Sequence, residues 1–204
     1  MRYSVKEQLC IIDSYMNCDY SVTMKVIKNL RERIPFQDFS DDKMGRNMTV
    51  VQVDETMLNY KCKSHRGRSP RNKTNALVIV ECGEKISRAY AKVIENKEAS
   101  TILSLICDNV MSGTKIFTDE HRSYSSLTRR GYVRMTVCHK YEFVKKINNA
   151  HTQFVESFNN VIKEEIKRRK GVSTVKIQIF LNEICWFFNN KDNRFMKILN
   201  FIKI

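Results

Sequence analysis

The segment VVQVDET (residues 50–56) joins an apolar run to two adjacent carboxylates. Its valines predict a buried β-strand over residues 50–53, because β-branched side chains pack well on a pleated sheet. Two like charges, Asp54 and Glu55, follow that strand directly. Side chains alternate along a strand, so we expect these two acids to point to opposite sides. Either the pair marks the surface end of a core strand, or one of the acids faces a positive group.

Strands and helices are predicted on both sides of this segment. Apolar and β-branched runs predict further strands at residues 76–81, 88–94, 115–118 and 132–138. Helical spacing of apolar residues predicts helices at about residues 98–111, 122–128, 152–168 and 174–190. Strands come first, then helices and strands in alternation, then helices alone. This order indicates an α/β fold in which helices cover a mixed sheet.

The N-terminal region reads as a small helical unit, residues 1–35, followed by a polar linker, residues 36–48. Apolar spacing predicts helices at residues 4–16 and 21–33. Pro35 ends the pair, since proline disfavours helix at the preceding residue. Two helices joined by a short turn are typical of a helix-turn-helix but equally of any helical hairpin. The main domain is expected at residues 49–204.

Composition favours a polyanionic partner. The chain has 204 residues and is 42% hydrophobic, which suits one main domain with a packed core. Lys and Arg outnumber Asp and Glu by 36 to 22, and the net charge is +14. Such a charge favours nucleic acid first and an anionic membrane surface second.

Cysteine usage and hydropathy predict an intracellular protein. The 7 cysteines are scattered and form no C-x-x-C pair, which fits a reducing compartment and no zinc site. Residues 1–20 lack an apolar signal region, and no apolar run reaches the length of a membrane span. We therefore expect no membrane association, and a nuclear or cytoplasmic location in a eukaryotic or bacterial host respectively.

Two further acids stand in informative places. Asp119 follows the strand predicted at residues 115–118, so a second strand ends in a carboxylate. Glu156 lies on the predicted helix in HTQFVESFNNVIKEEIKRRKG (residues 151–171), on the flank of its apolar face. The positions that follow Glu156 on its own side of the helix are Asn160, Lys163 and Lys167. Taken singly, these acids could be a strand terminator and part of a solvated helix flank.

Taken together, Asp54, Asp119 and Glu156 suggest a metal site. Clustered carboxylates repel one another and partly protonate unless a cation balances them. Oxygen ligands select Mg²⁺ or Mn²⁺, and two such ions about 4 Å apart can clamp an in-line phosphoryl displacement. In this interpretation a metal faces Asp54, whereas Glu55 points away and is not a ligand.

Three blocks carrying these acids resemble the catalytic blocks of DDE transposases. They are V-x-V-D-E-T, K-I-F-T-D-E-H-R-S-Y and H-T-Q-F-V-E-S-F. The pattern is similar to the Merlin superfamily and its bacterial insertion-sequence relatives with an ISXO2-like transposase domain, which run V-D-E-T, T-D-x-x-x-Y and H-T-N-x-I-E-S. The resemblance covers roughly residues 44–190. The chain departs from the pattern at Gln153, usually Asn, and at Asn159-Asn160, often Trp-Ser.

The resemblance implies a ribonuclease-H-like fold and metal-dependent cleavage and strand transfer of transposon ends. By position, Asp54, Asp119 and Glu156 are the catalytic, metal-binding acids, with two Mg²⁺ or Mn²⁺ ions. The partner is double-stranded DNA, as transposon end and as target, and the active form is expected to be a homo-oligomer. Basic side chains expected to contact DNA phosphates are Lys61, Lys63, Arg66, Arg68, Arg71, Lys73, Lys163 and Lys167.

Alternatives to a complete transposase remain. Relatives of this type carry a zinc ribbon and a fuller helix-turn-helix before the catalytic domain, so the chain is expected to be shortened at its N-terminus and to bind DNA with little sequence preference. One alternative is a transposon remnant that binds DNA without catalysis. Another is a different nuclease of the ribonuclease-H fold. A second basic region, which includes Arg134, could contact DNA or simply be solvated.

Overall fold

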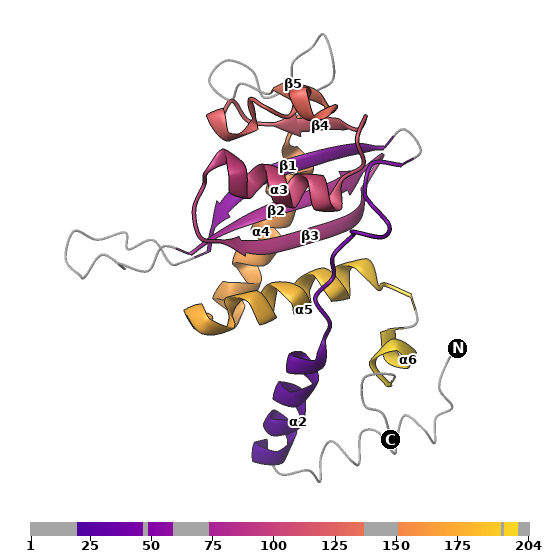
Figure 1. The fold of residues 1–204 in the computed structure, drawn as a ribbon. Coiled ribbons are helices and arrows are strands. Elements are labelled where there is room, and N and C mark those ends of the chain that lie inside the picture. The colour runs from indigo at the N-terminus through magenta and orange to yellow at the C-terminus, as the bar shows by residue number, and fades with distance from the viewer. Residues whose placement is uncertain (1–19, 47–48, 59–73, 137–150, 193, 200–204) are drawn as a thin grey trace, which may run out of the picture. The chain divides into compact units, whose positions relative to one another are not determined.

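The computed structural model describes residues 20–46, 49–58, 74–136, 151–192 and 194–199 (Figure 1). The chain divides into two compact units. One is Pro35–Asp192, and the other is Met1–Ile34 together with Asn193–Ile204. The helix predicted at residues 4–16 lies outside the described residues. The boundaries predicted for a helical unit, a linker and a catalytic domain stay a prediction.

A five-stranded mixed sheet forms the centre of the Pro35–Asp192 unit. Its order is β3-β2-β1-β4-β5. The strands are β1 (Val50–Met57), β2 (Asn75–Cys82), β3 (Ile86–Ile94), β4 (Lys115–Thr118) and β5 (Val133–Thr136). β2 pairs antiparallel with β1 and β3, whereas β4 pairs parallel with β1 and β5. The mixed sheet predicted from the sequence is confirmed.

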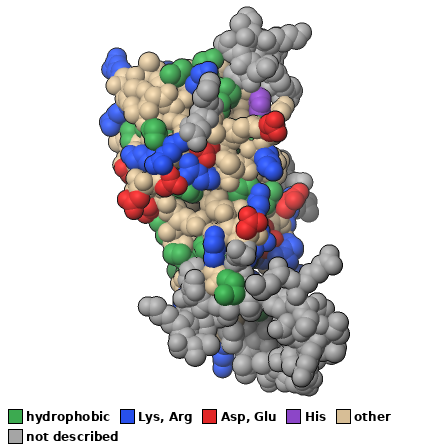
Figure 2. Space-filling model, turned by 90° about the vertical axis from the view of Figure 1, so that its right-hand side faces the viewer, with side chains coloured by type: hydrophobic (Ala, Val, Ile, Leu, Met, Phe, Trp, Pro, Cys, Tyr) green, Lys and Arg blue, Asp and Glu red, His purple; other side chains and the backbone are tan. Residues whose placement is uncertain are grey.

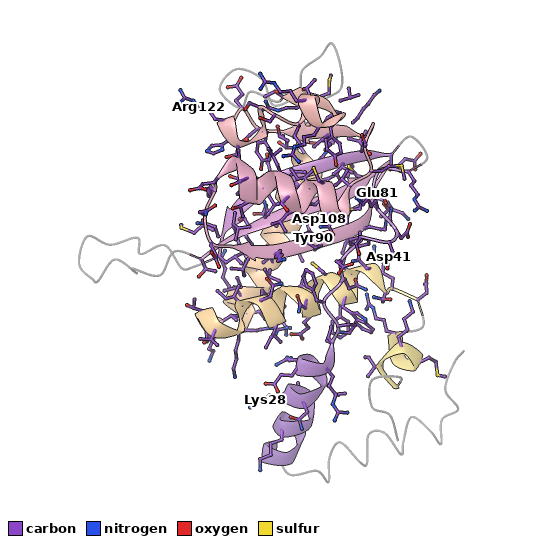
Figure 3. The ribbon with its side chains drawn as sticks, in the orientation of Figure 1. Lys28, Asp41, Glu81, Tyr90, Asp108 and Arg122 are labelled. Carbon is purple, nitrogen blue, oxygen red and sulfur yellow. The ribbon has the colours of Figure 1, made fainter. Side chains whose placement is uncertain are left out.

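Helices cover both faces of this sheet (Figure 1). Helix α3 (Ala99–Asn109) packs on one face, where Tyr90 of β3 points toward it (Figure 3). Helices α4 (Gln153–Arg168) and α5 (Ile177–Asn189) pack on the other face. Short 3-10 helices η1 (Arg122–Tyr124), η2 (Thr128–Arg130) and η3 (Thr174–Lys176) complete the connections. The expected α/β architecture, a mixed sheet flanked by helices, is confirmed.

The sequence of β2, NALVIVEC, explains why it lies inside the sheet. Leu77 and Ile79 belong to the core under α3, whereas Ala76, Val78 and Val80 belong to the core under α4 and α5. A strand buried on both faces needs a continuous apolar run rather than alternation. All five side chains are fully buried, so β2 anchors both cores.

β1 is longer than the sequence suggested. The strand was expected to end at Val53, but it continues to Met57. Its antiparallel pairing with β2 runs from Val50 to Met57, so the polar residues after Val53 still have a backbone partner. Parallel pairing with β4 stops much earlier, at Gln52 opposite Phe117. Loss of a neighbour, rather than loss of strand structure, therefore marks the position of the two acids.

Residues 35–46 belong to the same compact unit as the sheet. Met44 is fully buried and forms a parallel bridge to Val110, with hydrogen bonds to Asn109 and Met111. The sequence suggested a polar linker here, from Asp38, Asp41, Asp42 and Gly45. The buried Met44 shows that part of this segment packs against the unit that contains the sheet.

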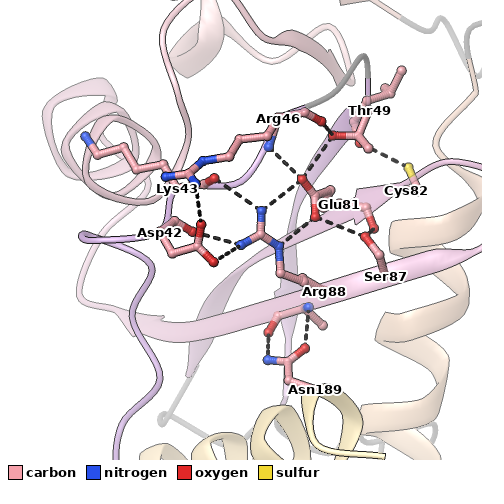
Figure 4. Close-up of polar contacts among 12 residues, drawn as sticks. Asp42, Lys43, Arg46, Thr49, Glu81, Cys82, Ser87, Arg88 and Asn189 are labelled. Carbon is pink, nitrogen blue, oxygen red and sulfur yellow. Dashed lines mark hydrogen bonds and ion pairs between the residues drawn. The ribbon is translucent and has the colours of Figure 1, made fainter.

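A buried ion pair holds the same segment at the end of the β2–β3 hairpin (Figure 4). Arg88 donates to both carboxylate oxygens of Glu81, from Nε at 2.6 Å and from Nη2 at 3.0 Å. Glu81 also accepts from the backbone N–H of Gly45 at 2.8 Å and from Thr49 Oγ1 at 3.0 Å. Arg88 in turn reaches the Asp42 carboxylate at 3.1 Å. The chain entering β1 is thereby fixed to the sheet.

The smaller unit contains α2 (Tyr20–Arg33) and α6 (Arg194–Leu199). Helix α2 confirms the helix predicted at residues 21–33. Lys28 and Glu32 form an exposed ion pair on it, at 4.0 Å. No helix in the described part of the chain has the length and apolar character needed to cross a membrane.

Candidate active site

Asp54 lies on β1 just beyond the point where β4 stops pairing with it. The antiparallel partner Val78 is still opposite Asp54, whereas the last parallel pair is Gln52 with Phe117. Side chains two apart on a strand share a face, so Asp54 and Gln52 face the same way. Gln52 Oε1 accepts from the Val155 N–H of α4 at 3.0 Å. Asp54 therefore faces α4, just beyond the point where the parallel pairing of β1 with β4 ends.

Asp119 follows β4 directly and is held by its neighbours. Its Oδ1 accepts from the His121 backbone N–H at 2.9 Å. Its carbonyl oxygen accepts from Arg134 Nη2 at 3.0 Å and from Thr118 Oγ1 at 2.8 Å. Because β1 and β4 run parallel, residues that follow their paired segments meet at one edge of the sheet. Asp54 and Asp119 therefore lie at the same edge of the sheet.

Glu156 stands in the first turn of α4. Thr152 Oγ1 donates to its Oε1 at 2.8 Å, and its backbone N–H donates to the Thr152 carbonyl at 3.1 Å. The start of the helix is attached to β1 through Gln52, which contacts the Val155 N–H and, at 3.4 Å from its Nε2, His151 Nδ1. These contacts bring Glu156 to the face of β1 that carries Asp54.

The charges of Asp119 and Glu156 both act on Asp54. The pKa of Asp54 is raised to about 6, and burial is the largest cause. Repulsion from Asp119 and Glu55, and to a smaller extent from Glu156, raises this pKa further. A hydrogen bond from the Glu55 backbone N–H lowers it in part. Within the described residues, however, no three His, Cys, Asp or Glu side chains already stand close enough together to hold a metal ion. The acids are near one another but do not form a closed ligand set.

The residues at this edge suit a hard divalent cation. Carboxylate oxygens are the ligands that Mg²⁺ and Mn²⁺ prefer in proteins. A cation between Asp54, Asp119 and Glu156 would remove the repulsion that raises the pKa of Asp54. The charge distribution therefore fits the metal that the sequence predicted, with these three acids as its candidate ligands.

Asn159 is a site residue that the sequence did not identify. It lies one helical turn after Glu156, is 4% exposed, and donates from Nδ2 to Asp54 Oδ2 at 2.8 Å. Its Oδ1 is buried without a hydrogen-bond partner. The spacing of three residues from Glu156 was a usable signal, because side chains at i and i+3 share a helix face. Related sequences often have Trp at this position, so the motif itself does not identify Asn159.

Glu55 points away from this site, as predicted. Its carboxylate accepts from the Tyr124 hydroxyl and lies 3.4 Å from Lys97 Nζ. Both partners lie on the α3 side of the sheet, since Tyr124 belongs to the core under α3. The side chains of the two adjacent acids of VVQVDET, Asp54 and Glu55, therefore point to opposite faces of β1.

The basic residues divide into several groups. Lys61, Lys63, Arg66, Arg68, Arg71 and Lys73 lie outside the described residues. Lys163 is half-buried and Lys167 is exposed on α4. Arg122, on η1, is exposed and points outward (Figure 3). On the face drawn in Figure 2, basic and acidic side chains are interspersed rather than gathered in a patch of one sign.

Comparison with known proteins gives one family match and several similarities. The ISXO2-like transposase domain matches residues 48–189. These residues run from just before β1 to the end of α5. An uncharacterised transposase-like protein of Haemophilus influenzae is 25% identical over 105 residues, which is 52% of this chain and 84% of that protein.

The solved structures similar to this chain include two integrase catalytic cores. The catalytic core domain of BIV integrase has 18% identity and a TM-score of 0.46, over 74% of this chain and 93% of that one. The catalytic core domain of HTLV-2 integrase, solved with magnesium in a trimeric form, has 14% identity and a TM-score of 0.44, over 75% and 92%.

Proposed function

Because the chain belongs to the family of ISXO2-like transposase domains, we propose that it cuts DNA and transfers the cut strand in a reaction that needs a divalent metal. The family makes it a DDE-type transposase domain, an enzyme of the polynucleotidyl transferase class. The finer proposal assigns the metal-binding roles to Asp54, Asp119 and Glu156. Three elements distant in sequence, β1, the end of β4 and α4, each contribute one acid, and the raised pKa of Asp54 supports their proximity.

Each residue has a distinct part in this proposal. Asp54, Asp119 and Glu156 would hold the cations, and Asn159 orients the Asp54 carboxylate through its amide. Gln52 keeps the first turn of α4 on β1, so that Glu156 stays opposite the two aspartates. Bound cations would activate water for cleavage and the 3′ hydroxyl of the cut strand for transfer, and would stabilise the charge that develops on the phosphate.

The proposed substrate is double-stranded DNA. Lys163 and Lys167 follow Glu156 along α4 and are at least partly exposed, so they are proposed to contact backbone phosphates of the bound DNA. Lys61, Lys63, Arg66, Arg68, Arg71 and Lys73 are proposed to add further phosphate contacts. We propose that the active form is a homo-oligomer.

A nicking assay with matched variants tests the acids. Supercoiled plasmid is incubated with the full chain and Mn²⁺, and nicking is followed over time. We expect Asp54→Asn, Asp119→Asn and Glu156→Gln each to reduce the rate by at least about 100-fold, because each removes a ligand oxygen. Glu120→Gln is the control, since Glu120 is an exposed acid next to Asp119. Nicking that survives all three substitutions would refute the assignment.

Strand transfer separates a transposase from a simple nuclease. A labelled duplex with a free 3′ hydroxyl is incubated with target plasmid under the same conditions. Covalent joining of label to plasmid, abolished by Asp54→Asn, is the expected result. Nicking without any joining would show a nuclease of this fold instead.

A further inference from the structure

Glu55 carries a buried carboxylate on the face of β1 opposite to Asp54. Its side chain is only 4% exposed. One oxygen accepts from the Tyr124 hydroxyl and the other lies 3.4 Å from Lys97 Nζ. Burial first, and then the charge of Glu55, hold the pKa of Tyr124 well above its ordinary value, so the hydroxyl keeps its proton and donates. None of the three candidate metal ligands, Asp54, Asp119 and Glu156, takes part in this hydrogen bond.

Tyr124 lies in η1, shortly after Asp119. The His121 backbone N–H donates to Asp119 Oδ1 at 2.9 Å, and the Tyr124 backbone N–H donates to the His121 carbonyl at 3.2 Å. A continuous series of hydrogen bonds thus runs from the Asp119 carboxylate through η1 to Glu55. Glu55 is the residue after Asp54, so the series joins the segments that carry the two aspartates.

Arg134 of β5 reinforces this connection. Its Nε donates to Thr118 Oγ1 at 3.1 Å, and its Nη2 donates to the Asp119 carbonyl at 3.0 Å. Its guanidinium carbon lies 5.9 Å from the centre of the Tyr124 ring. Arg134 therefore holds both the backbone of Asp119 and the ring that reaches Glu55. This internal role differs from the DNA contact considered for the basic region of the sequence.

The two aspartates need such a connection. They repel each other, and the parallel pairing between their strands has already ended at Gln52 opposite Phe117. Backbone hydrogen bonds between β1 and β4 therefore stop two residues before Asp54 and Asp119. The Glu55–Tyr124 bond is a contact beyond that paired region.

We infer that the Glu55–Tyr124 hydrogen bond positions Asp119 relative to Asp54 from the reverse face of the sheet. Glu55 and Tyr124 are then positioning residues for a divalent metal pair, a role that rests on the proposed function. Neither side chain touches the metal or the DNA. Their contribution is to keep two mutually repelling carboxylates at a separation that a cation can bridge.

Hydrogen exchange of the metal-free full chain tests the connection without any catalysis. Tyr124→Phe removes the hydroxyl and keeps the ring, and Glu55→Ala breaks the same bond from the other end. Both should speed exchange at residues 119–125. Glu55→Gln keeps an acceptor oxygen and should restore slow exchange. Unchanged exchange in Tyr124→Phe and in Glu55→Ala would overturn the inference.

A Mn²⁺ titration of nicking tests the positioning. Tyr124→Phe should raise the half-saturating Mn²⁺ concentration about tenfold, a typical effect of removing support behind a metal ligand, with most of the rate recovered at saturating metal. Glu55→Gln should stay within about threefold of the unmodified chain. Faster exchange with an unchanged Mn²⁺ requirement would show a purely structural bond and overturn the inference.

Tyr132→Phe is the matched control. Tyr132 is also buried, at 4% exposed, and its hydroxyl donates to the Val110 carbonyl at 3.0 Å, away from the acids. Tyr132→Phe should lower thermal stability without changing the Mn²⁺ requirement. A rise in the half-saturating Mn²⁺ concentration equal to that of Tyr124→Phe would overturn the inference.

If Asp54→Asn leaves nicking and its metal dependence unchanged, the proposed function fails and the positioning role fails with it. If Asp54→Asn abolishes nicking while Tyr124→Phe does not alter the Mn²⁺ requirement, only the positioning role fails.

Discussion

The side-chain amide of Asn159 donates to the Asp54 carboxylate at 2.8 Å, across the interface between α4 and β1. This bond ties the helix that carries Glu156 to the strand that carries Asp54. It leaves Asn159 Oδ1 buried and without a partner, which costs free energy. The bond therefore fixes the orientation of the Asp54 carboxylate relative to α4.

Replacing Asn159 with Ala should weaken the site. The Asp54 carboxylate would lose a donor that favours its charged form, so the pKa of Asp54 would rise further. Activity that needs ionised Asp54 rises with pH through that pKa. We therefore expect the increase of the nicking rate with pH to move to higher pH in Asn159→Ala. The measurement is the rate at limiting Mn²⁺ between pH 5 and 9.

Asn160→Ala is the control for this change, because Asn160 is the exposed neighbour of Asn159 on the same helix. It should leave the pH profile unchanged. A profile that does not move in Asn159→Ala either would show that the amide does not influence Asp54.

Replacing Asp54 with Asn should stabilise the metal-free protein at neutral pH. The folded state keeps the Asp54 proton up to about pH 6, whereas the unfolded state releases it near the ordinary value of 3.8. Between these values the folded state binds more protons, so stability falls as pH rises, by up to about 3 kcal/mol. Asn does not ionise, so Asp54→Asn does not lose this stability. Its melting temperature in chelator at pH 7.5 should exceed that of the unmodified chain by up to about 10 °C.

The difference in melting temperature between Asp54→Asn and the unmodified chain should shrink as the pH is lowered toward 4, where Asp54 of the folded protein is already protonated. Saturating Mn²⁺ should also reduce it, because only the unmodified site gains from the cation. Glu120→Gln, at an exposed acid, should show neither effect. Equal melting temperatures at pH 7.5 for Asp54→Asn and the unmodified chain would contradict this account.

Replacing Arg88 with Ala should strongly destabilise the fold. Burial by itself would raise the pKa of Glu81, but hydrogen bonds from Arg88, the Gly45 backbone N–H and Thr49 outweigh burial and lower it to about 2. Removing Arg88 leaves a buried charge uncompensated, at a cost of about 3–5 kcal/mol. Urea unfolding at pH 7 measures the loss.

The pH dependence of the same variant provides a second check. A lowered pKa stabilises the fold above the ordinary value of 4.5, and this contribution is lost as the pH falls toward 2. The difference between Arg88→Ala and the unmodified chain should therefore narrow with acidification. Arg46→Ala removes only an exposed ion pair with Asp42, at 3.1 Å, and should cost less than about 1 kcal/mol.

Replacing Gly45 with Ala should also destabilise the fold. Gly45 has a φ of +96°, and a Cβ there would lie 2.1 Å from Thr114 Oγ1. Both the backbone conformation and the close approach exclude a side chain. Gly83→Ala is the matched control, because a Cβ at Gly83 meets nothing within 4 Å. Thermal unfolding should separate the two variants by at least about 2 kcal/mol, and equal stabilities would contradict the prediction.

Local periodicity accounts for much of what the sequence predicted. The run ALVIVE (residues 76–81) identified a core strand because a strand buried on both faces needs apolar residues at every position. Alternation predicted that Glu55 points away from Asp54, and the Tyr124 bond confirms it. Helical spacing placed Glu156 beside the apolar face of α4. These properties depend only on residues close together along the chain.

The metal-binding roles of Asp54, Asp119 and Glu156 came from the three motif blocks and stay a prediction. The structure places Asp54 and Asp119 at one edge of the sheet and Glu156 on helix α4, but the motifs do not specify the contacts around them. Asn159 sits where related sequences often have Trp, so the resemblance pointed away from its role. Nothing in the sequence distinguishes Arg134 from the other basic residues, because its contacts with Thr118 and Asp119 depend on the pairing of β5 with β4.

The amino-acid sequence by itself determined which segments form strands and helices and which face of each segment is apolar, because these follow from the period of the backbone. Only the tertiary structure decided where β1 loses its parallel neighbour, that Met44 is buried, and that Asn159 meets Asp54. Each of these depends on which distant segments lie side by side. Pairing register and burial are properties of contacts between elements, and no local pattern in one element specifies its partner.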